Sequence, residues 1–499
     1  MARTLCLDVS FHIMAFADDP TVCRLMQVNK FFNIEGAKYL LDDSCITIAS
    51  SRQLDSLITF LSAYNGARLQ FLKGLCLEMQ SLSISVPKRL GALLTAHTDK
   101  ITMTLLDITH LDSIISSCRA LYAAFASLTT ITHIRFAGIN TVGSGFLRDF
   151  KSKVKVADLR WDPTPNIRLT ESASDEAKIP ISVLKNFQSS LVDLSATNVS
   201  FQRSNGDNTF DEVYPRLTDL QIQGVLITGM HTRTLVRAFP NLQNLVMVQP
   251  STHRGDDPTA LDAQHEHNIA EQLAHRSWPS LETISGGLLD MYILAPTCQV
   301  QEVHVTGPYM QTRALRRLLK RTRPAQLALA QFEGDLFTPA LTEMLRKPCA
   351  ARVECLEVMF RMGCTLPADT IDAPVMVESW IAAIRGLPRV RVLSIALHGA
   401  FLQFTRSGPH RFEPSAAERF FAALDLSALA QRLKDTIPTL KTVELTVEGV
   451  RGRREPRWVR LGPEDMEFET CAAATARMLN SQMPELGTLG TLGFVHSAN

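Results

Sequence analysis

Histidine and acidic side chains come closest to a metal-binding or catalytic cluster at His265, Glu266 and His267, with His275 further along the chain. Two histidines that bind one metal from a helix usually stand four residues apart, because that spacing places them on one face. His265 and His267 are two residues apart, so a helix would direct them to different sides. We therefore expect no metal site here and no cofactor.

The sequence contains none of the common motifs that mark a catalytic centre. It has no GxxxxGK[ST] phosphate loop, no GxSxG nucleophile turn and no HExxH zinc helix. We accordingly predict no catalytic residues, and a protein that acts by binding other molecules rather than as an enzyme.

Basic side chains cluster at residues 313–323, in the sequence RALRRLLKRTR, around Leu315, Leu318 and Leu319. This spacing favours an amphipathic helix whose charged side is solvated. Arginine also suits phosphate, so a dock for an acidic or phosphorylated partner stays open as an alternative. A second basic segment, RGRREPRW at 451–458, indicates an exposed loop.

The composition is that of a folded protein without a general attraction to polyanions. Of the 499 residues, 45% are apolar and 20% are charged, which is ordinary for a globular chain. The 51 basic and 50 acidic side chains nearly cancel, so no net field favours nucleic acid or a membrane surface as a partner. There is no uncharged apolar run long enough to span a bilayer. We expect a soluble protein of the cytoplasm, the nucleus or both.

Ten cysteines are scattered along the chain without a CxxC pair and without a histidine at metal-ligand spacing. This distribution indicates reduced and mostly buried thiols, as in other intracellular proteins.

The elements that would position any binding residues follow a recurring pattern: an apolar residue, Pro, then Leu or Val before an alternating apolar triplet. Pro ends a helix and begins a loop, and the triplet has the period of a short strand with one buried face. Between copies lie segments with helical spacing, such as residues 375–387. Copies with Pro begin at Tyr214, Phe239, Trp278, Leu387, Ile437 and Met483, and copies without Pro begin at Leu69, Leu128, Leu191, Val300 and Val353.

The repeated unit of helix, loop and strand predicts an α/β fold. A strand and a helix every 25 to 30 residues or so, with LxxLxL spacing, resemble an irregular leucine-rich repeat. Such repeats form a solenoid with parallel strands on the concave face and helices on the convex face. A closed β/α barrel is the rival, but it has eight strands, whereas about twelve short units are present here. We predict the solenoid over residues 49–499, with its last strand near 489–494 and loop insertions at 162–182 and 250–264.

The first 48 residues have a different pattern, in which apolar residues at helical spacing surround the sequence ADDP at 17–20. Asp18, Asp19 and Thr21 offer capping oxygens around Pro20, which suits the start of a helix. A unit of this size buries too little surface to be stable alone, so we expect it to dock on the repeats, on a partner, or on both.

The segment LCLDVSFHIMAFADDPTVCRLMQVNKFF, residues 5–32, resembles the F-box. The family pattern has a leucine, a proline, an acidic residue, an apolar run ending in phenylalanine, an aspartate-proline turn and a second apolar helix. EGAKYLL at 35–41 is similar to the third helix of fungal members. One departure is Cys6, which stands where the family usually has proline, and Ser10 replaces a more common leucine.

An F-box followed by leucine-rich repeats resembles the substrate receptors of Skp-cullin-F-box ubiquitin ligases. The resemblance implies that the F-box binds the Skp adaptor, and through it a cullin, while the repeats bind an unidentified protein substrate. By position it assigns the adaptor contact to Leu5, Val9, Ile13, Leu25 and Val28, any of which would otherwise serve as core. The alternative is an interaction scaffold whose F-box, with Cys6 in place of proline, no longer binds the adaptor.

The solenoid prediction also locates the substrate face. Strand residues that alternate with the buried ones point to the concave side, and they mix polar and small apolar types that suit a protein surface. These residues are Asp219, Gln221, Gln223, Asn244, Val246, Val248, Glu302, His304, Thr306, Ser394, Ala396, Thr442, Glu444 and Thr446.

Overall fold

The fold comes from a computed structural model. The structure describes residues 7–28, 30–41, 45–80, 85–162, 175–203, 210–224, 231–248, 258–306, 311–332, 339–361, 372–398, 414–449 and 456–463. In this part of the chain, short strands alternate with helices, as the repeated pattern predicts. The contacts within the chain divide it into two units, Met1–Leu242 and Gln243–Asn499. That division runs through the repeats, and the predicted boundary at residue 48 stays a prediction.

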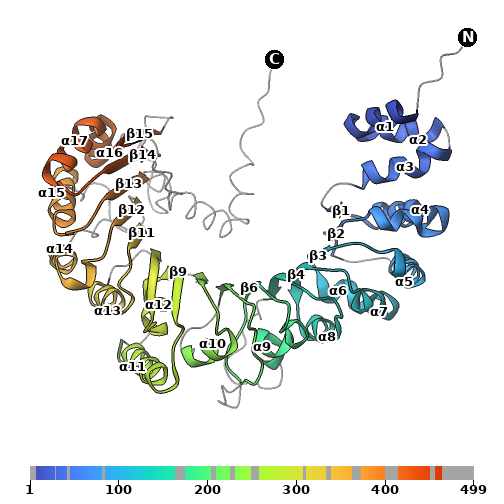
Figure 1. Ribbon diagram of the computed structural model, residues 1–499, viewed down its shortest axis with the longest axis horizontal. Coiled ribbons are helices and arrows are strands. Elements are labelled where there is room, and N and C mark those ends of the chain that lie inside the picture. The colour runs from blue at the N-terminus through green and yellow to red at the C-terminus, as the bar shows by residue number, and fades with distance from the viewer. Residues whose placement is uncertain are drawn as a thin grey trace, which may run out of the picture. The chain divides into compact units, whose positions relative to one another are not determined.

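The first unit begins with three helices and continues with strands and helices in alternation (Figure 1). Its strands are β1 (Ile46–Ile48), β2 (Gly74–Leu77), β3 (Leu105–Ile108), β4 (His133–Ile139), β5 (Val156–Trp161), β6 (Asp193–Thr197) and β7 (Asp219–Gln223). Its α-helices are α1 (Leu7–Phe16), α2 (Asp19–Val28), α3 (Lys30–Leu40), α4 (Ser51–Gly66), α5 (Ser85–Ala96), α6 (Leu111–Ser116), α7 (Arg119–Ser127), α8 (Thr141–Asp149), α9 (Pro180–Val183) and α10 (Thr232–Ala238). Its 3₁₀ turns are η1 (Ala67–Phe71), η2 (Thr98–Lys100), η3 (Asp175–Lys178) and η4 (Lys185–Phe187).

The second unit repeats the alternation with longer strands. Its strands are β8 (Asn244–Val248), β9 (Ser280–Gly287), β10 (Gln299–Thr306), β11 (Gln326–Phe332), β12 (Cys355–Arg361), β13 (Val392–His398), β14 (Thr442–Glu448) and β15 (Arg457–Leu461). Its helices are α11 (Pro258–His275), α12 (Leu288–Leu294), α13 (Thr312–Thr322), α14 (Pro339–Leu345), η5 (Pro348–Ala350), α15 (Ala373–Ile384), α16 (Ala416–Ala423) and α17 (Leu426–Thr436).

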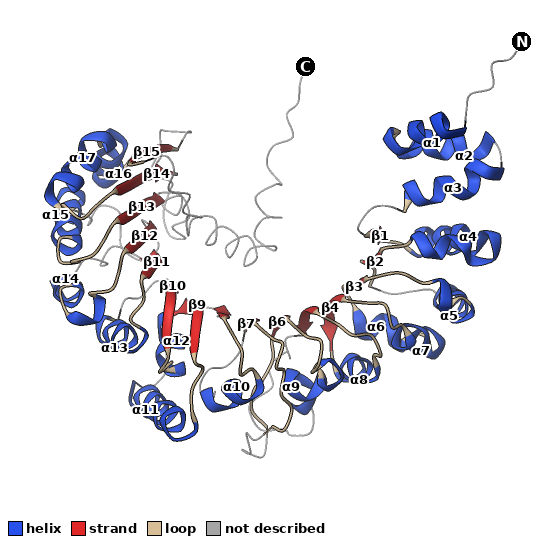
Figure 2. Ribbon diagram, in the orientation of Figure 1, coloured by secondary structure: helices blue, strands red, loops and turns tan. Residues whose placement is uncertain are grey.

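Strands pair in chain order in both units. From β1 to β7, and from β8 to β14, each strand lies parallel to the next, whereas β15 lies antiparallel to β14. In each unit the helices lie along one side of the strands (Figure 2). Within a unit the first and last described strands are not neighbours, so the sheet is open and the closed barrel is excluded. The prediction of an α/β fold with stacked parallel strands is confirmed.

Columns of aliphatic side chains hold the strands in register. In the first unit, Leu75, Leu106, Ile134, Ala157, Leu194 and Leu220 are successive partners across six strands, and all are buried. In the second unit, Ile284, Val303, Leu327, Leu356, Leu393 and Val443 form the equivalent column. A slip of one residue would turn such a column to the other face, at a cost of about 1.5–3 kcal/mol for each buried aliphatic side chain.

The strand positions largely follow the prediction. Every copy of the pattern that falls on described residues coincides with a strand, whereas the copy at Met483, with its strand near 489–494, lies outside the described residues. The pattern missed β1, β3, β5, β11 and β15, where the Leu spacing is absent or broken. The predicted strands of three residues were too short, since β9 and β10 have eight residues each.

Two of the predicted loops contain helices. Residues 258–264, assigned to a loop insertion, begin the 18-residue helix α11. Pro258 is the first residue of this helix, a position where the fixed φ angle of proline is favourable. The proline was interpreted as part of a loop, but it marks the start of a helix. Residues 175–182 likewise contain η3 and most of α9. Arg457 and Trp458, the end of the other predicted loop, belong to β15.

The seven cysteines that the structure describes are free thiols, but most of them are not fully buried. Among the described cysteines, Cys76 and Cys298 are buried, Cys23 is exposed, and the others are half-buried, with none in a disulfide. Burial raises the pKa of Cys76 to about 12 and that of Cys298 to about 11, so both stay protonated at neutral pH.

Candidate functional site

The three N-terminal helices pack around a small core of their own. Met14, Val22, Met26, Phe32 and Ala37 are buried together. Gly36 allows α3 to approach α1 and α2, because an added Cβ would lie 2.4 Å from Met26 Cγ and 2.6 Å from Met14 Cε. The three helices thus pack as a unit, whereas Ile46–Ile48, which belong to the segment predicted as helical, form strand β1.

The ADDP sequence forms the turn between α1 and α2. The Asp18 carboxylate accepts a hydrogen bond from the Thr21 backbone N–H at 3.1 Å and so caps the first turn of α2. Hydrogen bonds from Thr21 lower the pKa of the Asp18 carboxyl below its usual value. The capping prediction around Pro20 is therefore confirmed.

Large apolar side chains remain exposed on this helical unit. The exposed fractions are 49% for Val9, 45% for Ile13, 81% for Phe16, 68% for Val28 and 46% for Phe31. Val9, Ile13 and Phe16 lie at positions i, i+4 and i+7 of α1 and so form one stripe. Val28 is the last residue of α2, and Phe31 is the second residue of α3. We call these five residues the exposed apolar patch. None belongs to the buried core, although the Phe31 ring contacts Phe11 at the edge of that core, with 5.2 Å between the ring centroids.

Three of the five predicted adaptor contacts lie in this patch, namely Val9, Ile13 and Val28. Leu25 is half-buried and packs against the core of the helical unit, and Leu5 lies outside the described residues, as does Cys6. Phe16 and Phe31 were not among the predicted contacts. Phe16 has a signal in the sequence, because it extends the helical spacing of Val9 and Ile13.

Arg68 joins the helical unit to the first repeat. Its side chain, 5% exposed, donates to the Asn33 carbonyl of α3 at 2.8 Å and to the Phe60 carbonyl of α4 at 3.1 Å. The guanidinium lies over the Phe60 ring, 4.1 Å from its centroid. Burial lowers the pKa of Arg68, but its ordinary value is so high that the group stays charged. The expected docking of the small unit on the repeats is thus confirmed.

Most of the predicted substrate-face residues lie on the strand side away from the helices. In the first unit, Asp219, Gln221 and Gln223 of β7 are half-buried and alternate with buried Leu220 and Ile222. In the second unit, the same alternation leaves these predicted residues half-buried: Asn244, Val246, Val248, Glu302, Thr306, Ser394, Ala396, Glu444 and Thr446.

His304 and Thr442 are buried, so their predicted exposure is wrong. His304 is 5% exposed, because Ser285 and Ala328 flank it on the adjacent strands and the Glu302 carboxylate lies 3.6 Å from its Nε2 atom. Thr442 is covered by the chain at Gly462, just after β15, which the sequence pattern did not predict. The alternation of apolar and polar residues along a strand predicts the face on which each residue lies. It does not predict which neighbouring strands or loops cover that residue.

Trp458 of β15 is 67% exposed and pairs across the strands with Thr446. The preceding residue, Arg457, donates to the Phe421 carbonyl at 2.6 Å and to the Leu424 carbonyl at 2.9 Å, which fixes the start of the strand. An exposed tryptophan beside predicted contact residues is a further candidate for binding, since aromatic residues are enriched at interfaces.

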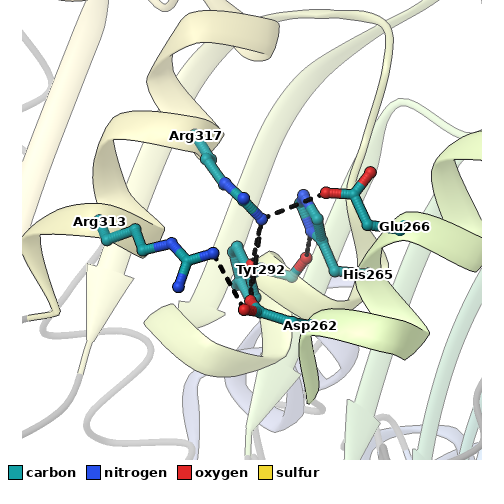
Figure 3. A network of polar contacts seen from close by, with 6 residues as sticks. All are labelled: Asp262, His265, Glu266, Tyr292, Arg313 and Arg317. Carbon is teal, nitrogen blue, oxygen red and sulfur yellow. Dashed lines mark hydrogen bonds and ion pairs between the residues drawn. The ribbon is translucent and has the colours of Figure 1, made fainter. Parts of the chain in front are cut away.

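The His265 segment is part of a polar network between α11, α12 and α13 (Figure 3). His265 is buried, donates from Nδ1 to the Tyr292 carbonyl at 2.5 Å and stacks on the Tyr292 ring at 4.0 Å. Burial lowers the pKa of His265, so its imidazole is neutral at neutral pH. The described residues contain no group of three or more His, Cys, Asp or Glu placed to hold a metal ion.

Arginines of α13 complete this network. Arg313 lies 3.0 Å from the Asp262 carboxylate, and Arg317 lies 3.3 Å from Glu266 and 2.6 Å from the Tyr292 hydroxyl. A hydrogen bond from Tyr292 lowers the pKa of the Asp262 carboxyl, and the two arginines lower it further. The prediction of an amphipathic helix at 313–323 is confirmed, with Leu315, Leu318 and Leu319 buried. Two of its arginines bind carboxylates rather than solvent alone.

Comparison with known proteins adds no assignment. No protein-family model matches this chain, and no curated protein matches it significantly. In the described part of the chain, no helix combines the length and apolar character needed to cross a membrane.

Proposed function

We propose that this protein is the substrate-recognition subunit of a Skp-cullin-F-box ubiquitin ligase. In this proposal, α1–α3 bind the Skp adaptor and the strand faces bind a protein substrate in the cytoplasm or nucleus. The receptor carries out no chemistry; it raises the local concentration of substrate lysines near a ubiquitin-conjugating enzyme.

The exposed apolar patch is the observation that carries the proposal. A helical unit that leaves Val9, Ile13 and Val28 exposed, although it has a core of its own, has a surface suited to an apolar partner. These three positions are also those at which the F-box resemblance places the adaptor contact. The anchoring of the unit through Arg68 supports a fixed link between adaptor and repeats.

Co-purification of the full chain with the Skp adaptor tests the proposal. Burying a valine in an interface contributes about 1.5–3 kcal/mol, so Val28→Asp should weaken the complex by about tenfold or more. Val375→Asp is the matched control, because Val375 is 59% exposed on α15 in the other unit. A folded wild-type chain that forms no complex would reject the ligase proposal.

Cys6 favours a second candidate, an interaction scaffold that has lost adaptor binding. Proline suits the first turn of a helix because its φ angle is already set, and Cys6 lacks this advantage. If the wild type fails to bind the adaptor and Cys6→Pro restores binding, the departure at this position is the cause. If neither binds while the chain stays folded, the scaffold is the better assignment.

A further inference from the structure

A basic hollow in the second unit lies beside the polar network of Figure 3. Its volume is 650 Å³, within the range of small-molecule sites. Five cationic side chains and one carboxylate line it, along with the neutral His265, Thr297 and Gln299. The cations are Arg317, Lys320, Arg321, Arg323 and Arg352, and the carboxylate is Glu266.

The single carboxylate is already neutralised. Glu266 pairs with Arg317 at 3.3 Å, and Arg317 also contacts Asp262 at 3.8 Å. Lys320, Arg321, Arg323 and Arg352 form no ion pair with any acidic group that the structure describes. Arg352 is instead held by an amide, since Gln299 accepts from its two terminal nitrogens at 3.0 and 3.1 Å once the amide is oriented to satisfy both groups. The hollow therefore has an excess of four positive charges.

Stabilisation of α13 does not account for this excess. Cations near a helix C-terminus interact favourably with the helix dipole, and Lys320 and Arg321 lie in the last turn of α13. That dipole corresponds to about half an elementary charge, so one cation is enough to balance it. Arg352 comes from a different element, the segment between η5 and β12, and has no part in this effect.

We propose that this hollow binds a phosphate-bearing anion. A carboxylate carries one charge, whereas a phosphate monoester carries about 1.5 to 2 negative charges at neutral pH and three acceptor oxygens. Guanidinium groups match these oxygens with paired hydrogen bonds. The ligand is a free polyphosphate or the phosphorylated side chain of a protein. The site lies at the ends of α13 and β10 rather than on the strand face, so the inference does not rest on the proposed function.

The test uses the full chain with two probes, inorganic pyrophosphate and a phosphoserine peptide compared with its unphosphorylated form, in isothermal titration at near-physiological salt. Lys320→Gln/Arg321→Gln should weaken binding by about tenfold or more, because two charge-assisted contacts are lost. Arg316→Gln/Arg389→Gln is the control, since it removes the same charge from two exposed positions of the same unit that lie outside the hollow and outside the polar network. Arg352→Gln supplies an independent variant from another element.

Binding of pyrophosphate alone assigns the site to a free polyphosphate, and phosphate-dependent binding of the peptide assigns it to a phosphorylated protein. Either result upholds the site if the control double variant binds within about twofold of wild type. Absence of measurable affinity for both probes, or an equal loss in the two double variants, overturns the proposal. Circular dichroism melting of each variant establishes that any loss occurs in a folded chain.

Discussion

Two glycines inside helices, one at the contact between α5 and α7 and one beside open space on α8, should have opposite effects on stability when replaced by alanine. Replacing glycine by alanine inside a helix normally stabilises a protein by about 0.5–1 kcal/mol. At Gly91 of α5, however, an added Cβ would lie 2.9 Å from the Ala120 carbonyl carbon and 3.0 Å from the Leu121 nitrogen. Both are backbone atoms, so no side-chain rotation relieves the overlap. At Gly145 of α8 the nearest atom is the Tyr122 hydroxyl, at 4.0 Å.

Overpacking costs about 1–3 kcal/mol, and a clash with backbone atoms belongs in the upper half of that range. After the helix gain of about 0.5–1 kcal/mol is subtracted, Gly91→Ala should lower the free energy of unfolding by about 1–2.5 kcal/mol. Gly145→Ala should raise it by about 0.5–1 kcal/mol. In a unit of this size, about 1 kcal/mol corresponds to about 2–4 °C in the melting midpoint. Circular dichroism melts and urea titrations of both variants measure the two shifts.

A Gly91→Ala variant as stable as the wild type would refute the reasoning, because it would mean that α5 does not approach the α7 backbone so closely. A destabilised Gly145→Ala variant would show that the open space beside α8 is absent. The opposite signs make the pair informative, since any general effect of removing a glycine acts on both alike.

Three further predictions concern single residues. Burial lowers the pKa of His265 in the folded chain, so the free energy of unfolding should decrease as the pH falls below about 6.5. The urea midpoints at neutral and at mildly acidic pH should therefore differ less for His265→Gln than for the wild type. The buried Trp380 ring stacks on Phe360, with 4.5 Å between the ring centroids. Trp380→Ala should lower the free energy of unfolding by about 3–5 kcal/mol, and an unchanged urea midpoint would contradict the buried position of this side chain. The Asp112 carboxylate accepts hydrogen bonds from the backbone N–H groups of Asn140 and Gly143, both at 2.8 Å, so Asp112→Ala should lower the free energy of unfolding by about 1–2 kcal/mol. Urea titration measures this loss, with Asp99→Ala, at an exposed position, as the comparison.

The sequence determined the local elements. An alternating apolar triplet buries one face whatever its neighbours are, so strands such as β7 and β14 could be located from their own residues. The spacing of Val377, Trp380 and Ile384 likewise located the buried side of α15. Because these patterns depend on residues a few positions apart, they needed no knowledge of the fold.

The N-terminal helices show where such reasoning reaches its limit. Periodicity indicated an apolar surface, but an apolar stripe on a short helix serves a core and a docking surface equally well. Only the packing of the three helices separated Val22 and Phe32, which fill the core, from Val9 and Val28, which remain exposed. The role of each residue depended on contacts with other helices.

Tertiary structure alone decided the contacts between residues far apart in the chain. Arg68 reaches Asn33, 35 positions earlier, and Arg317 meets Glu266 across 51 positions. His304 belongs by alternation to an open face, yet its neighbours on adjacent strands bury it. The periodicity of apolar residues indicates which side of its own helix or strand a residue occupies. Burial, ion pairing and the basic hollow arise from other segments, which the local sequence does not specify.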